Sequence, residues 1–287
     1  MRKSRIVAAA IAAIAAAALA VTLAPGAVSA KPAADNPPET ADAAPDSARQ
    51  NLTKIMPLGD SITWGYTIKH GTPVALDGYR KDLWARLHDS AKLSPDFVGS
   101  CPRQGDDEWK CYGKGSGTFG DYNHEGHSGF RVHQLSANIE RWLDLYEPEI
   151  VLLMAGTNDV GKPDAAEAPG RLSAMIDKMR DKRPGTRLFV ATIPQFGDAA
   201  ARARVKVYND AVARIVPTKG DKVHLVPQHI VGAESEDLSP DNIHPSDCGY
   251  AKLSYVWFYY MNRVLNGGRW DNGYWPWSEA PGPCAGP

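Results

Sequence analysis

The stretch Glu149-Ile150-Val151-Leu152-Leu153-Met154 is apolar at every position after its first residue. A continuous apolar run is typical of a strand in a parallel sheet, because helices cover both faces of such a sheet. The polar block Gly156-Thr157-Asn158-Asp159 follows near the carboxyl end of this expected strand. Ligand sites of open α/β sheets lie outside the carboxyl ends of their strands. The stretch therefore predicts the fold class and the edge of the sheet at which a functional site is expected.

Expected strands and expected helices alternate along the sequence, both before and after this strand. The expected strands span 54–58, 96–99, 149–154, 188–193 and 223–226, and the expected helices span 78–91, 132–146, 172–182, 199–216 and 246–264. Asp77 is the expected N-cap of the first helix. Strands that alternate with amphipathic helices predict an α/β fold, here a three-layer α/β/α sandwich with a central parallel sheet of about five strands.

The two ends of the chain differ from this core in composition. Residues 1–30 start with charged residues, continue as an Ala-rich apolar run and close on small residues at 28–30, which is the pattern of a cleaved signal peptide. A retained membrane helix is the alternative, but an Ala-rich run makes a weak anchor. Residues 31–50 contain almost no large apolar side chain, which predicts a disordered linker. Residues 51–266 are then the folded domain, and residues 267–287 are a Trp-rich tail.

Charge limits the possible partners. The chain has 32 basic and 33 acidic residues, and removal of the leader cations Arg2, Lys3 and Arg5 leaves 29 basic residues and a formal net charge of −4. No run is rich in Lys or Arg, so nucleic acid, whose binding depends on phosphate neutralisation, is not expected as a partner. The sequence predicts a secreted, extracellular monomer without stable membrane insertion after cleavage.

Four cysteines in a chain with an export signal predict two disulfides. Cys101 and Cys111 flank a polar loop and are expected to pair, and Cys248 would then pair with Cys284 and tie the tail back. Four cysteines allow three pairings, and closeness in the sequence is the ground for this one. Four reduced thiols are the alternative. A metal site is not indicated, because the sequence has no CxxC or tight Cys/His cluster.

Four short polar blocks carry the candidate functional residues. Three of them follow expected strands, directly or through a loop, and one lies between the second strand and its helix. The blocks are Gly59-Asp60-Ser61, Gly126-His127-Ser128-Gly129, Gly156-Thr157-Asn158-Asp159 and Asp241-Asn242-Ile243-His244. All four are therefore expected at one end of the sheet.

Together the blocks supply the groups that acyl transfer to water requires. Ser61 is the candidate nucleophile, His244 the candidate general base, and Asp241 the carboxylate that orients the base. The backbone N–H groups of Ser61 and Gly129 and the side-chain amide of Asn158 are candidate donors to an oxyanion. Taken singly, the blocks could equally be a helix N-cap, a turn glycine, an Asn-Asp helix start and a turn. The joint pattern favours the functional interpretation.

Other titratable residues near the blocks are expected to be structural. Asp60 and Asp159 would anchor their own loops, and His224 lies inside a strand pattern. His124 and His127 could belong to a metal site, but no nearby third ligand completes it. We therefore expect neither a metal nor a cofactor.

In this order the blocks resemble the SGNH, or GDSL, hydrolase superfamily, whose name lists the Ser, Gly, Asn and His that they contain. Within it the chain is most similar to carbohydrate esterase family three, over residues 53–265. The stretches that carry this resemblance are Ile55–Thr63, Gly78-Tyr79-Arg80, Asp96–Ser100 and His124–Gly129. The resemblance implies the SGNH fold and a cofactor-independent serine esterase that removes acetyl groups from xylan. By position, it implies the same roles for the five candidate residues.

Two segments depart from the family pattern. The Cys101–Tyr122 loop is longer than the family's usual connection, and the tail Arg269–Trp277 is additional. The aromatic side chains of the tail could stack on sugar rings or pack over the domain. We expect acylated carbohydrate, or another small ester, as substrate. The alternatives are a lipase or phospholipase activity on the same scaffold and a noncatalytic carbohydrate-binding protein that uses the Trp-rich tail.

Overall fold

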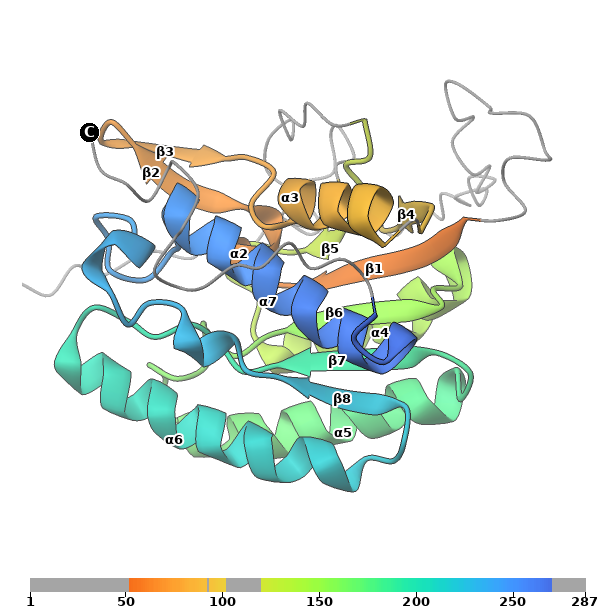
Figure 1. Ribbon diagram of the computed structural model, residues 1–287. Coiled ribbons are helices and arrows are strands. Elements are labelled where there is room, and N and C mark those ends of the chain that lie inside the picture. The colour runs from red at the N-terminus through yellow and green to blue at the C-terminus, as the bar shows by residue number, and fades with distance from the viewer. Residues whose placement is uncertain (1–51, 92, 102–119, 270–287) are drawn as a thin grey trace, which may run out of the picture. The chain divides into compact units, whose positions relative to one another are not determined.

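The computed structural model describes residues 52–91, 93–101 and 120–269 (Figure 1). All of them belong to one compact unit that spans residues 44–287. The expected signal peptide and linker, and nearly all of the expected tail, lie outside the described residues. Those assignments stay predictions.

A parallel sheet forms the centre of this unit. Its strand order is β4 (Pro95–Phe97), β1 (Thr53–Gly59), β6 (Ile150–Met154), β7 (Arg187–Ala191) and β8 (Val223–Val226), and each neighbouring pair is parallel. A two-residue strand, β5 (Glu125–Gly126), pairs in parallel with Leu58 and Gly59 at the carboxyl end of β1. The predicted parallel sheet is confirmed, and its short extra strand brings one of the four blocks to the end of β1.

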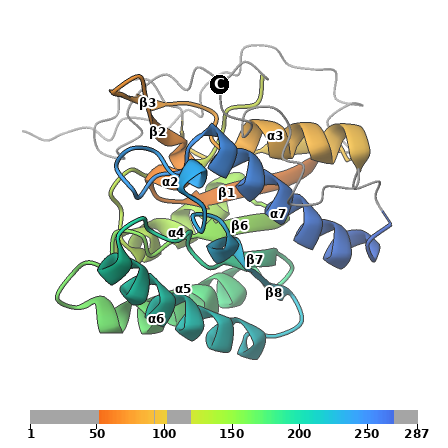
Figure 2. The same cartoon turned by 60° about the vertical axis from the view of Figure 1, so that its left-hand side comes forward.

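Helices cover both faces of the sheet, as Figures 1 and 2 show. Helices α4 (Val132–Tyr146), α5 (Ala168–Lys182) and α6 (Ala199–Ile215) pack against one another on one side, and α3 (Arg80–Ala85) packs against α7 (Asp247–Asn266) on the other. All five residues of β6 are buried, as expected of a strand between two helical layers. The predicted three-layer α/β/α sandwich is confirmed.

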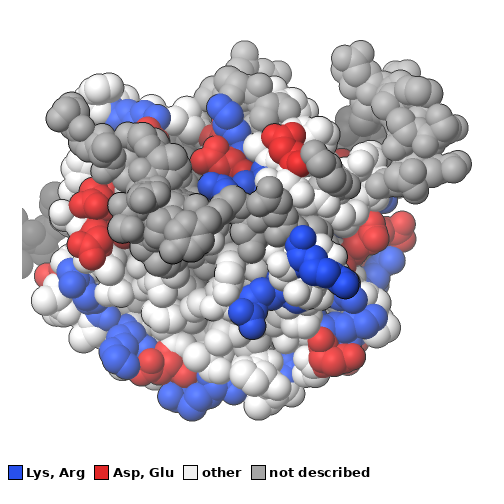
Figure 3. Space-filling model, in the orientation of Figure 1, with Lys and Arg blue, Asp and Glu red and all other residues white. Residues whose placement is uncertain are grey.

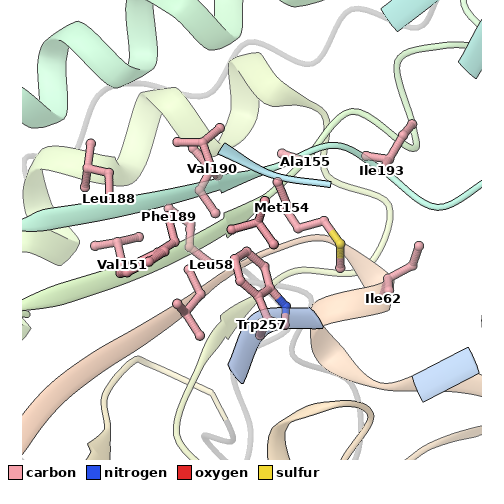
Figure 4. Close-up of a cluster of buried hydrophobic side chains, with 14 of the residues drawn as sticks. Leu58, Ile62, Val151, Met154, Ala155, Leu188, Phe189, Val190, Ile193 and Trp257 are labelled. Atoms are coloured by element: carbon pink, nitrogen blue, oxygen red, sulfur yellow. The ribbon is translucent and has the colours of Figure 1, made fainter. Parts of the chain in front are cut away.

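The core lies between the sheet and these helices. Figure 4 shows buried side chains of β1, β6 and β7 in one apolar cluster, which Trp257 of α7 enters from the helical layer. Ile62, just after the end of β1, belongs to the same cluster. Burial of this apolar surface is the main stabilising contribution to the fold, and it also holds the carboxyl ends of the strands in place.

The structure corrects two details of the prediction. An antiparallel hairpin, β2 (Tyr66–Lys69) with β3 (Thr72–Ala75), was not predicted. The expected N-cap role of Asp77 was wrong, since α3 begins at Arg80, and it is the backbone carbonyl of Asp77 that accepts the Arg80 N–H, at 3.1 Å. The helix starts late because Gly78 has a φ of +55°, which is not helical. The backbone of Gly65 also passes so close to Gly78 that a Cβ on Gly78 would lie 2.8 Å from the Gly65 Cα.

Most other elements lie within a few residues of their predicted bounds. Helix α4 and strand β8 have the predicted bounds. Helix α5 starts four residues earlier than predicted, at Ala168, because Pro169 is tolerated in the first turn of a helix. After Ala85, α3 continues as a π-helical turn, Arg86–Ser90, which completes the expected helical stretch.

Candidate active site

Ser61 stands where strand β1 passes into a short helix, α2 (Ser61–Trp64). The strand ends at Gly59, where a Cβ would lie only 2.2 Å from the carbonyl oxygen of Met154 on β6, so only glycine fits. The side chain of Asp60 caps α2, since its Oδ1 accepts the Ile62 N–H at 3.0 Å. As the first residue of the helix, Ser61 has a backbone N–H without a partner inside the helix.

The side chains of Ser61, His244 and Asp241 form one continuous chain of hydrogen bonds. Ser61 Oγ lies 2.8 Å from His244 Nε2, and His244 Nδ1 lies 2.6 Å from Asp241 Oδ2. Because a carboxylate can only accept, Nδ1 carries the proton and Nε2 is the acceptor for the Ser61 hydroxyl. The structure therefore brings Ser61 to a histidine and an aspartate that lie far from it in the sequence.

Asp241 also builds the turn that carries His244. Its Oδ1 accepts the backbone N–H groups of Ile243 and His244, both at 3.0 Å. Partial burial alone would raise the pKa of Asp241, but the hydrogen bonds from the His244 side chain and from these two N–H groups outweigh it and hold the pKa below 3.8. The carboxylate is thus charged and fixed beside the imidazole at neutral pH.

Tyr66, at the start of β2, packs with its ring against the imidazole ring of His244. The ring centroids of Tyr66 and His244 are 4.3 Å apart. The carbonyl of Tyr66 accepts the hydroxyl of Tyr250 on α7 at 2.6 Å, which ties the hairpin to that helix. Neither Tyr66 nor its hairpin was predicted from the sequence. The run Tyr66-Thr67-Ile68 before His70-Gly71 is a strand-and-turn signal that could have indicated it.

Gly129 and Asn158 are joined through one tight turn, His127-Ser128-Gly129-Phe130. The Phe130 N–H donates to the His127 carbonyl at 3.1 Å, and Gly129 has a φ of +76°, which favours glycine. No atom lies within 4 Å of where a Gly129 Cβ would be, so its surroundings are open. Asn158 Nδ2 donates to the Phe130 carbonyl at 2.9 Å, and the His127 N–H donates to the Gly59 carbonyl at 2.9 Å. The turn is therefore anchored to Gly59, two residues before Ser61.

Two of the three aspartates of the blocks, Asp60 and Asp159, hold loops in place. Asp159 is buried, and its carboxylate accepts the Val132 N–H at 3.0 Å and the Arg131 Nε at 3.1 Å, which fixes the start of α4. Asp60 is fully buried, and this burial raises its pKa from 3.8 to about 6 against the opposing effect of the Ile62 N–H. These contacts agree with the anchoring roles expected for both residues.

The histidines considered as metal ligands have other partners. Nδ1 of buried His124 accepts the Gly126 N–H at 2.9 Å, and burial holds the pKa of His124 well below 6.5. His127 lies 2.6 Å from Glu125. His224, which was expected to be structural and not a metal ligand, packs beside Phe189 with ring centroids 5.2 Å apart. Among the described residues, no group of three or more His, Cys, Asp or Glu side chains is arranged to hold a metal ion.

Cys101 and Cys248 are buried, and neither is a free thiol. Their expected partners, Cys111 and Cys284, lie outside the described residues, so the pairing stays a prediction. In the described part of the chain, no helix is both long and apolar enough to cross a membrane. On the face shown in Figure 3, basic and acidic side chains are interspersed, without one continuous basic patch.

Comparison with known proteins shows the family. Residues 58–252 match the GDSL-like lipase/acylhydrolase family. The chain belongs to this family. A multidomain esterase of Ruminococcus flavefaciens is 30% identical over 230 residues, which are 74% of this chain but only 28% of that protein.

Two solved structures of carbohydrate esterases are similar to this chain. A family 3 carbohydrate esterase of Clostridium thermocellum has a TM-score of 0.60 and 32% identity, and the match covers 75% of this chain and 98% of that one. A carbohydrate esterase of family 3 from Talaromyces cellulolyticus has a TM-score of 0.60 and 25% identity, with coverage of 75% and 99%. The resemblance predicted from the four blocks is confirmed.

Proposed function

We propose that this protein is a secreted serine esterase that hydrolyses O-acyl esters, in particular O-acetyl esters, on carbohydrate such as xylan. The observation that carries the proposal is the hydrogen-bonded chain from Ser61 Oγ through His244 to Asp241. This order of hydroxyl, imidazole and carboxylate is what a serine nucleophile needs for activation.

In the first half of the reaction, Nε2 of His244 takes the Ser61 proton as Oγ attacks the ester carbonyl carbon. The carbonyl oxygen becomes an oxyanion, which accepts from the backbone N–H groups of Ser61 and Gly129 and from the side chain of Asn158. The intermediate collapses when the imidazolium of His244 protonates the leaving sugar hydroxyl. The acyl group then remains bonded to Ser61.

In the second half, His244 takes a proton from water, which attacks the acyl-enzyme carbonyl. The same donors hold the second oxyanion, and the collapse returns the proton to Ser61 Oγ and releases the carboxylic acid. Throughout, Asp241 keeps the Nδ1 proton in place and stabilises the charged imidazole. No step requires a metal or a cofactor.

Asn158 suits the donor role because its amide has two hydrogens. One donates to the Phe130 carbonyl, which fixes the rotation of the side chain. The second stays available for an oxyanion. At Gly129, the absence of a side chain lets a substrate oxygen approach the backbone N–H closely.

The substrate class rests on the relatives. Two solved relatives with at least 25% identity are family 3 carbohydrate esterases, and both are matched over nearly their whole length. Secretion rests on the leader-like residues 1–30, and an extracellular site is where plant polysaccharide would be met. We accordingly place the monomeric enzyme outside the cell, with acylated carbohydrate as its substrate.

Hydrolysis of 4-nitrophenyl acetate, butyrate and octanoate tests the proposal, with the Ser61→Ala variant beside the oxidised wild type. We expect a strong preference for acetate, loss of turnover in Ser61→Ala, and release of acetate from acetylated xylan. Ser173→Ala, a partly exposed serine on α5, is the matched control and should keep full activity. Preference for octanoate would favour a lipase instead. Absence of turnover in the wild type, or turnover that survives Ser61→Ala, would refute the site.

A further inference from the structure

A buried carboxylate–imidazole pair, Glu125 with His127, lies beside the proposed site. We infer that this pair is a positioning element that sets the oxyanion donors Gly129 and Asn158 in place. The inference rests on the proposed function and names residues to which that function gives no role.

Glu125 is held by three donors although it is fully buried. Its Oε1 accepts the Ser100 N–H at 2.7 Å, and its Oε2 accepts the Ser100 hydroxyl at 2.9 Å and His127 Nε2 at 2.6 Å. A buried carboxylate is costly unless it is hydrogen-bonded in this way. The arrangement is therefore specific, and each donor has a defined place.

The ring of His127 is fixed on its two faces as well as at Nε2. It stacks on Phe130 with ring centroids 4.9 Å apart, and on Trp142 of α4 with centroids 4.8 Å apart and planes within 5° of parallel. Both the ring and the Glu125 side chain are fully buried. Rotation of His127 would therefore require the surrounding rings to move.

His127 and Phe130 are the first and last residues of the turn that carries Gly129. The turn is closed twice, by the hydrogen bond from the Phe130 N–H to the His127 carbonyl and by the stack of the two rings. The positive φ at its third residue, Gly129, is the signature of a type II turn. The orientation of His127 therefore sets the direction in which the Gly129 peptide N–H points.

The same turn also controls the second donor. The Phe130 carbonyl accepts from Asn158, so any shift of the turn moves the amide that faces the oxyanion. Oxyanion donors act over about 2.7–3.1 Å, and a misplacement of about 1 Å can cost on the order of 100-fold in rate. The hydrogen bond between Ser61 and His244 involves no residue of this turn.

Glu125→Gln tests the inference. Ser100 and His127 both donate to Glu125, and the NH2 group of glutamine would direct a third donor at one of them. We expect kcat for 4-nitrophenyl acetate to fall roughly 10- to 100-fold, as for a partly misplaced oxyanion donor. KM should change little, and the pH profile should keep its shape, because His244 and Asp241 are untouched. Glu140→Gln, an exposed carboxyl on α4, is the matched control and should have wild-type kinetics.

A double-mutant cycle with Asn158→Ala separates positioning from general damage. If Glu125 acts through the oxyanion donors, Glu125→Gln should cost much less in the Asn158→Ala background than in the wild type. Fully additive losses would overturn the inference. So would wild-type kcat in a Glu125→Gln variant with a native circular dichroism spectrum.

If Glu125→Gln does not fold, Ser100→Ala replaces it in the same cycle. This change removes only the hydroxyl donor to Oε2, and a several-fold loss of kcat is expected, again reduced in the Asn158→Ala background. Unchanged kcat in Ser100→Ala would then overturn the inference. Failure of the proposed function has a different signature, since Ser61→Ala would then keep its activity or the wild type would have none.

Discussion

Tyr66 packs against the imidazole of His244, with ring centroids 4.3 Å apart and ring planes inclined by 49°. The contact joins the first hairpin of the domain to the turn before α7. Asp241 holds the histidine through Nδ1, and Ser61 lies at Nε2. Tyr66 covers a face of the ring and thereby limits how far the imidazole can tilt away from the serine.

Tyr66→Ala should lower kcat/KM for 4-nitrophenyl acetate by about 10-fold, because His244 gains freedom to leave its productive orientation. Tyr66→Phe is the control: it keeps the ring, and the hydrogen bond from Tyr250 goes to the backbone carbonyl. It should retain nearly full activity. Equal losses in both variants would mean that the hydroxyl, and not the ring contact, is what matters.

Asp241→Asn should reduce kcat by roughly 100- to 10,000-fold. The amide cannot accept from Nδ1 of His244 and from the two backbone N–H groups at once, so one donor loses its partner. Steady-state kinetics at neutral pH would measure the loss. Activity within a few-fold of wild type would show that the carboxylate does not orient the base.

Asp60 should make the stability of the fold depend on pH. Burial raises its pKa to about 6 from 3.8, so the folded state holds its proton more tightly than the unfolded chain. The stabilisation is complete below pH 3.8 and is lost as pH rises through about 6. Chemical denaturation of the wild type and of Asp60→Asn would measure this.

The difference in unfolding free energy, Asp60→Asn minus wild type, should rise with pH between about 4 and 6 and level off above. Asp181→Asn, an exposed carboxyl at the end of α5, is the control and should follow the wild type throughout. A flat difference curve for Asp60→Asn would contradict the raised pKa.

Two glycines of one block should respond differently to alanine. At Gly126, a Cβ would lie 2.5 Å from the backbone nitrogen of Trp64, which cannot move away cheaply, so Gly126→Ala should destabilise the fold severely. At Gly129, the Cβ would meet no atom, and only the φ of +76° is unfavourable, at a cost of about 1–2 kcal/mol. Thermal unfolding should rank the two variants in this order.

Gly129→Ala should therefore remain folded but lose kcat, since relief of the strained φ would turn the peptide N–H of this residue. A Gly129→Ala variant with wild-type kcat would remove Gly129 from the set of oxyanion donors. The stability measurement on the same protein shows that any loss of rate is not a loss of fold.

Patterns that act over a few residues were sufficient for much of the architecture. The bounds of α4 and β8 follow from periodicity alone, and a fully apolar β6 predicts a strand with both faces covered. The predictions from sequence failed where contacts with distant parts of the backbone decide the local conformation. Gly78 leaves the helical region because the chain passes Gly65 there, and no pattern near Gly78 carries that information.

The candidate site also combines features that local sequence predicts with features that depend on contacts between distant segments. The spacing of Asp241 and His244 is enough to predict that the carboxylate reaches the imidazole, because a three-residue turn permits few other arrangements. Whether Ser61 meets that imidazole depends on where the chain places two segments that are far apart in sequence. The pairing of β1 with β6, and the packing of α7 beside it, settle that distance at 2.8 Å.

The amino-acid sequence by itself determined the alternating α/β order and the residue types that can act on an ester, since these follow from local patterns and side-chain chemistry. Only the tertiary structure decided that Tyr66 covers His244 and that Glu125 and His127 support the turn of Gly129. Contacts of this kind join elements that the sequence does not relate. They form because burying the core brings strand ends and loops to one edge of the sheet, where side chains then find their partners.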